Sequence, residues 1–192
     1  MALSCPIRTW RRVSDLVEWR YCGRFGYMKQ NAMPTPEFTW IDEGEALRRL
    51  HDPSKELTVV APVDEAMGIV PWFITVTTAE FPSFTVTHQT LPGVPLSKTW
   101  WTNLGDGRLF GDIAEIWDYP PVEEIMFRDE SYALMHATVH NNEDGTGWMT
   151  IREKGSPVET TADRRFDPTP LYRPVPEWGQ WAELAGAQLP GR

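Results

Sequence analysis

Two alternating runs joined by a polar turn, residues 132–154, constrain the fold of this chain more than any other feature. The first run, residues 132–140, alternates with a period of two, so one face carries Ala133, Met135, Ala137 and Val139. The second run, residues 148–154, alternates in the same way, and the segment between them is rich in Asn, Asp and Gly. The pattern predicts a β-hairpin, and we expect it to form a central pair of strands.

Similar strand patterns precede the hairpin at intervals of roughly ten residues, with Gly- and Pro-rich turns between them. They predict strands over residues 57–63, 71–78, 83–89 and 109–119, and a turn at Gly105-Asp106-Gly107. Residues 30–38 hold two prolines and an asparagine and are expected to form a loop. This spacing favours an antiparallel meander over βαβ units.

Helical patterns occur at the two ends of the chain. Apolar residues recur at helical spacing from Pro6 to about Arg20, which predicts an N-terminal helix. A second helix is expected from Asp42 to His51, because Glu45 follows Asp42 at the spacing of a capping box.

The C-terminal tail has four prolines between residues 168 and 176 and should be extended and largely without ladder hydrogen bonds to the sheet. A short helix is predicted over residues 177–188. We expect its Trp178 and Trp181 to clamp the tail onto the sheet. The predicted fold is therefore α+β and a single domain, residues 1–192. Its parts are a mainly helical region (1–55) packed on one side of the sheet, an antiparallel β-meander (57–161) and the Pro-rich tail with its short helix (162–192).

The net charge of −9 is unevenly distributed along the sequence. Residues 1–60 carry nine basic and eight acidic side chains, residues 61–150 three and thirteen, and residues 151–192 six of each. The central region thus holds a net −10, which either keeps the protein soluble or attracts a basic partner. Direct binding of nucleic acid is disfavoured, because phosphates would be repelled.

The cellular compartment is predicted from three features: membrane-spanning runs, a signal peptide and cysteine content. No apolar run is long enough to span a membrane, and the first residues have no signal-peptide pattern. Two cysteines, Cys5 and Cys22, do not make a disulfide framework. These observations predict a cytoplasmic protein that does not bind membranes.

No catalytic, metal or cofactor motif is present in the sequence. His136 and His140 have a ligand spacing for a helix, but on a strand they would lie about 13 Å apart, too far to share one zinc ion. We therefore expect no metal and no cofactor, and the lack of these motifs favours a protein without enzymatic activity.

The acidic stretch that follows the turn at Gly105 is the best candidate for a site. Protein partners would be bound by carboxylates and exposed aromatic residues of this stretch, namely Asp112, Glu115, Trp117, Asp118, Tyr119, Glu123 and Glu124. The ten tryptophans support this interpretation, because Trp is enriched at binding sites. The favoured function is an acidic protein-binding module that inhibits or sequesters a basic partner such as a toxin or an enzyme. Small toxin-neutralising (immunity-like) proteins of bacteria are similar in composition.

Two other classes of function remain open. The first is a small-ligand-binding protein or enzyme with a pocket lined by Trp72, Trp100, Trp101 or Trp117 and with carboxylates as acid and base. The second is an assembly subunit in which exposed aromatic residues form an interface between copies. A deep pocket that gathers polar groups would favour the ligand-binding protein or enzyme. An exposed apolar face would favour the assembly subunit, and a flat or convex acidic face would favour the inhibitor.

Overall fold

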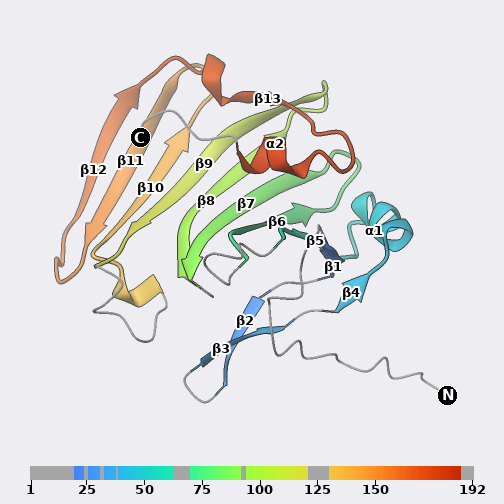
Figure 1. The fold of residues 1–192 in the computed structure, drawn as a ribbon. Helices are drawn as coiled ribbons and strands as arrows, with labels where there is room; N and C mark the ends of the chain where they lie inside the picture. The colour runs from blue at the N-terminus through green and yellow to red at the C-terminus, as the bar shows by residue number, and fades with distance from the viewer. Residues whose placement is uncertain are drawn as a thin grey trace.

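A computed structural model of the protein describes residues 20–23, 26–30, 33–37, 39–62, 70–91, 94–120 and 130–186. They form an antiparallel sheet of 11 strands, a separate two-stranded sheet and two short α-helices (Figure 1). The strands are β1 (Arg20–Cys22), β2 (Gly26–Gln30), β3 (Met33–Glu37), β4 (Trp40–Ile41), β5 (Leu57–Val60), β6 (Trp72–Thr77), β7 (Ser83–Leu91), β8 (Val94–Asn103), β9 (Arg108–Asp118), β10 (Met135–Asn141), β11 (Thr146–Glu153), β12 (Glu159–Arg165) and β13 (Tyr172–Pro174). The helices are α1 (Glu43–Leu50) and α2 (Trp181–Ala185), with 3-10 turns at Glu130–Tyr132 and Thr169–Leu171.

The predicted meander is present. Each strand from β5 to β12 pairs with the next along the chain, while β1 and β4 extend the sheet beyond β5. In the Pro-rich tail β13 pairs with β9, so the prediction that the tail lacks ladder hydrogen bonds is wrong over Tyr172–Pro174. The four strands predicted before the hairpin correspond to β5, β6, β7 and β9. The turn before β9 has Gly105 and Gly107 at φ of 79° and 87°, a conformation that favours glycine.

The predicted hairpin is confirmed as β10 and β11, with Asn141 opposite Gly147 at its turn, although β10 begins at Met135 and Tyr132 lies in the preceding 3-10 turn. The prediction that this hairpin forms the central pair of strands is wrong. In the described sheet the hairpin lies near one edge, with only β12 beyond it, and the middle strands are β7 to β9. Turn residues and alternation determine which two strands pair locally, but they carry no information on how many strands are added on either side.

The predicted α+β class, with N-terminal helices packed on one side of the sheet, is also wrong. The second predicted helix exists as α1, and the Asp42 side chain accepts a hydrogen bond of 2.7 Å from the Glu45 N–H, as in the predicted cap. Most of the first predicted helix, residues 6–19, lies outside the described residues. Its last residue, Arg20, belongs to a strand, because β1 fits between β5 and β4 and pairs with both.

Residues 30–38, predicted to form a loop, contribute to a hairpin in which β2 and β3 form their own two-stranded sheet. Pro34 and Pro36 occupy alternate positions of β3. Alternate residues of a strand direct their backbone groups to the same side, so both prolines can face the open edge. A two-stranded sheet therefore tolerates a sequence that a central strand would exclude.

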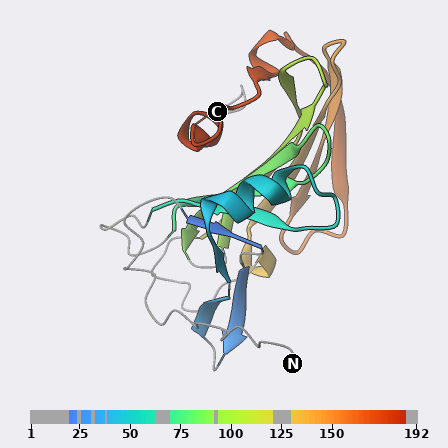
Figure 2. The ribbon, with the colours of Figure 1, turned by 90° about the vertical axis from the view of Figure 1, so that its right-hand side faces the viewer.

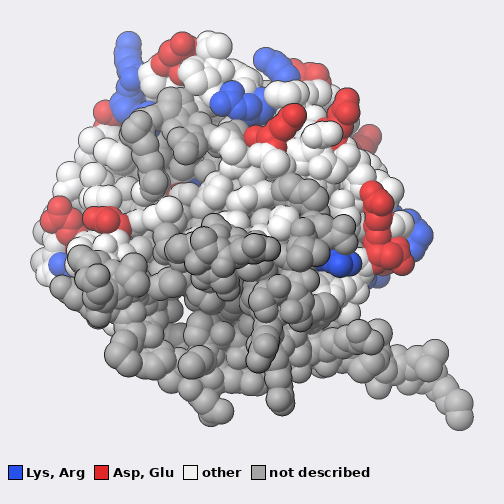
Figure 3. Space-filling model, viewed as in Figure 1, with Lys and Arg blue, Asp and Glu red and all other residues white. Residues whose placement is uncertain are grey.

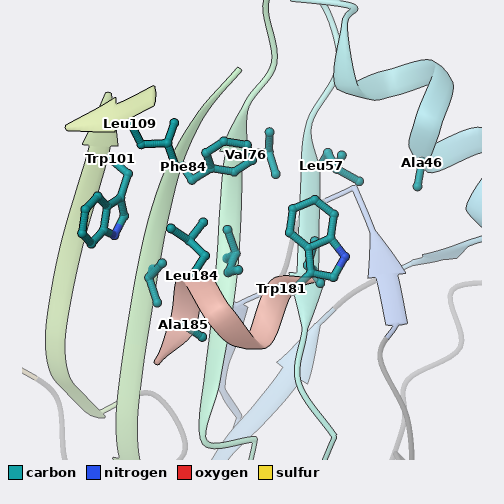
Figure 4. Close-up of a cluster of buried hydrophobic side chains, with 12 residues drawn as sticks. Ala46, Leu57, Val76, Phe84, Trp101, Leu109, Trp181, Leu184 and Ala185 are labelled. Carbon is teal, nitrogen blue, oxygen red and sulfur yellow. The ribbon is translucent and has the colours of Figure 1, made fainter. Parts of the chain in front are cut away.

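The main sheet bends, and α2 lies inside the bend (Figure 2). We call this side of the sheet the concave face and the other side the convex face. Trp181, Leu184 and Ala185 of α2 pack against apolar side chains of β5 to β9 (Figure 4). The strand residues of this core are Leu57, Val59, Ile74, Val76, Phe84, Val86, Trp101 and Leu109. Ala46 of α1 belongs to the same core, so the C-terminal helix α2 and the N-terminal helix α1 both contribute to it.

The tail is attached by the two tryptophans as predicted. Trp181 is 1% exposed, and its indole N–H donates a 3.3 Å hydrogen bond to the Tyr21 hydroxyl. Trp178 stacks on Tyr21 and donates a 2.7 Å hydrogen bond to Glu43 at the start of α1. These contacts join the C-terminal segment to β1 and α1, so the two ends of the described chain stabilise each other.

Candidate protein-binding face

The convex face of β8 to β11 carries polar and aromatic side chains. The strand register links Val139 across two intervening strands to the core residue Val86, which places Val139 on the concave face. Alternation then directs the even-numbered residues of β10 and their cross-strand partners to the convex face. We call the resulting surface the convex platform. Its members are Lys98, Glu115, Trp117, His136, His140 and Trp148.

One part of the convex platform is built around Trp117. Its ring stacks on His136 with centroids 4.8 Å apart, and the Lys98 ammonium lies 5.0 Å from its centroid. The buried His136 Nε2 atom is 3.7 Å from a carboxylate oxygen of Glu115 and has no hydrogen-bond partner among the described residues. Trp117 is only 4% exposed, so its indole is covered. The accessible surface of this cluster is therefore formed by the polar side chains around the indole.

The other part of the convex platform is the pair His140 and Trp148. Their rings stack at 4.4 Å with 13° between the planes, and Trp148 is 39% exposed. Stacking holds the indole in one orientation while leaving part of it accessible, which suits an anchor for a partner. Both residues belong to the predicted hairpin, but neither was among the residues predicted to bind a partner. The available signal was their facing position across the predicted turn.

The predicted site residues are divided between the two faces. Glu115 and Trp117 belong to the convex platform, whereas Asp118, one position further on, is exposed on the concave face opposite Met135. Tyr119 follows the end of β9 and is half-buried. Glu123 and Glu124 lie outside the described residues.

Asp112, the remaining predicted site residue, occupies a β-bulge. Trp100 lies opposite Ile113 and Trp101 opposite Gly111, so Asp112 is the extra residue on β9. One carboxylate oxygen of Asp112 accepts a 2.9 Å hydrogen bond from Thr102, and the other is buried with no donor in the described part of the chain. The other edge of β9 pairs with β13 at residues 108–110 and with β10 at residues 113–118. Between these two pairings the Asn141 side chain donates a hydrogen bond to the Gly111 carbonyl. Asp112 is therefore held at the bulge by its hydrogen bond to Thr102 on the neighbouring strand.

Several acids of the central region have local partners at the turns. Arg108 forms a 2.5 Å ion pair with Asp106 and holds the pKa of that carboxyl below its ordinary value. The hydroxyl and N–H of Thr146 donate to Asp144 and lower its pKa in the same way. On the concave side, acidic and basic side chains are interspersed over the described surface (Figure 3). On this face the described charged side chains therefore do not form a patch of one sign.

The described residues can be checked for a cluster of metal ligands and for a reactive thiol. Within the described ranges, no three His, Cys, Asp or Glu side chains are placed to hold a metal ion. Burial raises the pKa of the Cys22 thiol to about 12, which keeps it in the unreactive thiol form at neutral pH.

A cavity of about 480 Å³ lies between the segment after β13 and α2. Its lining combines polar and apolar side chains, namely Arg173, Glu177, Gln180 and Glu183 with Pro174, Val175, Pro176 and Leu184. None of the four tryptophans predicted to line a pocket is among them. Glu177 and Glu183 are exposed. The cavity is therefore a hollow of mixed polarity beside the helix, without the Trp lining that the ligand-binding alternative predicts.

Comparison of the chain with protein-family models, with curated proteins and with solved structures gave no match to any of them. Neither helix of the described chain has the length and apolar character that crossing a membrane requires.

Proposed function

We propose that this protein is a protein-binding module that inhibits or sequesters a basic partner, and that the convex platform is its contact surface. The observation that carries the proposal is Trp148, an indole held by stacking on His140 and 39% exposed among polar neighbours. Interfaces concentrate their binding energy in a few aromatic anchors surrounded by polar groups.

Charge supports the choice of a basic partner. The protein carries a net −9, and a field of this sign raises the rate at which a basic protein approaches. The convex platform itself holds both Lys98 and Glu115, which lie directly opposite each other on β8 and β9. In this proposal the overall charge accelerates encounter, whereas the platform determines orientation and lifetime of the complex.

The first test is capture of the partner at low salt with the wild-type protein and with Trp148→Ala. A protein that is basic, binds the wild type and is lost with Trp148→Ala supports the proposal. Phe81→Ala is the matched control, because Phe81 is an exposed aromatic residue, 52% accessible, in the turn between β6 and β7. Equal binding to the Trp148 variant and the wild type would exclude the platform as the contact surface.

The second test separates encounter from anchoring. Reversal of Asp118, Glu123 and Glu124 to Lys should lower the association rate by about tenfold or more, with little change in dissociation. Trp148→Ala should instead raise the dissociation rate. An acidic partner, or association that is indifferent to salt and to the triple reversal, would contradict charge steering and leave the acidity as a solubility feature.

A further inference from the structure

β12 (Glu159–Arg165) is the terminal strand of the main sheet, and six of its seven residues are exposed. Figure 1 shows no other labelled strand on its outer side. An edge strand of this length offers a row of backbone N–H and C=O groups to any strand that can align with it. A partner strand must match both the residues that direct these groups outward and the side chains beside them.

The backbone hydrogen bonds near the hairpin turn show which residues of β12 face outward. The Thr146 carbonyl accepts from Asn142 on the β10 side, so the odd-numbered residues of β11 face β12. The odd-numbered Gly147 of β11 lies opposite the even-numbered Arg164 of β12. Just beyond the strands, the N–H of Phe166 donates to the Gly145 carbonyl, so here too an even-numbered residue on the β12 side bonds to an odd-numbered residue on the β11 side. Within β12, residues 160, 162 and 164 therefore bond to β11, and residues 159, 161, 163 and 165 direct their backbone groups outward.

The sequence of β12, Glu-Thr-Thr-Ala-Asp-Arg-Arg, is complementary to itself when it runs antiparallel about Ala162. In that alignment Glu159 lies opposite Arg165 of the second copy, and Thr161 lies opposite Asp163 of the second copy. These are the residues whose backbone groups point outward, so each pair can exchange two hydrogen bonds. The small Ala162 side chains meet at the two-fold axis, and no like charges stand directly opposite each other.

We propose that β12 is a dimerisation edge, and that two copies of this chain join antiparallel through it into one continuous sheet. Charged side chains on an edge strand commonly prevent association. Here the same charges form opposite-sign pairs when two copies align. Glu159 already forms an ion pair with Arg152 of β11, so Arg165 of the second copy would extend a row of alternating charges on the convex face.

This alignment leaves the proposed contact surface accessible. Trp148 lies on β11, one strand in from the edge and opposite Asp163. Pairing through backbone groups at the edge does not cover the convex face. The dimer would therefore present two convex platforms on the same side of the joined sheet, and its existence does not depend on the proposed function.

The test is a charge swap followed by sedimentation over a range of concentrations. Glu159→Arg and Arg165→Glu should each weaken self-association by about tenfold or more, because each places like charges opposite each other twice. An equimolar mixture of the two variants should associate again, since both cross-pairs are then of opposite sign. The double variant Glu159→Arg/Arg165→Glu should also recover. Glu183→Arg on α2 is the matched control for charge and should leave association unchanged.

A backbone substitution tests the same edge without changing charge. Thr161→Pro removes an N–H that points outward and should give a folded monomer, whereas Thr161→Ala keeps that N–H and should remain dimeric. Circular dichroism checks that each variant is folded. A wild-type protein that is monomeric at all concentrations would overturn the proposal. So would single swaps that associate like the wild type, or a mixture of the two swaps that does not associate.

Discussion

The two halves of the main sheet are made of similar strands but are stabilised differently. In β5 to β8 α2 packs on the concave face, and the core side chains there, such as Leu57, Ile74 and Trp101, are almost completely buried. In β11 and β12 most side chains are half-buried or exposed. There the hydrogen-bond ladder, the glycine turn and side-chain pairs such as Arg152 with Glu159 hold the strands. An alternating pattern of apolar and polar residues is therefore enough to form a strand. The large buried core forms where a helix packs on the strands.

The largest effect is expected at the centre of the covered half. Trp181→Ala removes an indole that is 1% exposed and should lower the free energy of unfolding by about 3–5 kcal/mol. Trp148→Ala in the exposed half should cost less than about 1 kcal/mol. Urea denaturation of the two variants checks the comparison. Equal losses would show that α2 does not close the main core.

A second substitution pair tests how much of a core the hairpin half has. Val139 is 7% exposed on the concave face of β10, so Val139→Asp should bury a carboxylate and cost about 3 kcal/mol. The neighbouring residue Thr138 is half-buried and lies on the convex face. Thr138→Asp should therefore lower the free energy of unfolding by clearly less. Equal melting temperatures for both variants would contradict the assignment of the faces.

The glycine turn gives a third comparison within the hairpin half. Gly145 and Gly155 both have φ of 80°, a conformation that costs an alanine about 1–2 kcal/mol. A Cβ on Gly145 would also lie 2.6 Å from the Phe166 carbonyl oxygen, whereas no described atom lies within 4 Å of one on Gly155. Gly145→Ala should therefore be the more destabilising change in urea denaturation. If the two variants unfold at the same denaturant concentration, the approach of residue 166 to the turn does not stabilise the hairpin.

The smallest effect concerns pH. Hydrogen bonds from Thr146 lower the pKa of Asp144, so its ionised form stabilises the folded state above the ordinary pKa of about 3.9, and this contribution is lost as pH falls through the lowered value. Asp144→Asn should reduce the melting temperature at pH 7 and lose this difference near pH 2. A difference that persists unchanged at pH 2 would show that the carboxylate charge is not the cause.

Part of the local structure of this protein was predictable from its sequence. The positions of β5, β6, β7 and β9, the hairpin of β10 and β11 and the cap of α1 at Asp42 depend on neighbours a few residues apart. The candidate site was predicted only in part. The sequence indicated Glu115 and Trp117, but the faces of single strands did not show that Trp148 would be the accessible indole, since exposure depends on what packs above each strand.

The tertiary structure alone decided which element covers the sheet and where each strand lies in it. Trp181 contacts Tyr21, 160 residues away, and Trp178 bonds to Glu43 across 135 residues. Such contacts leave no periodic signal in the sequence, because their partners are chosen by burial of apolar area rather than by spacing. For the same reason a stretch with helical spacing ended in β1, where pairing with two neighbouring strands satisfied its backbone.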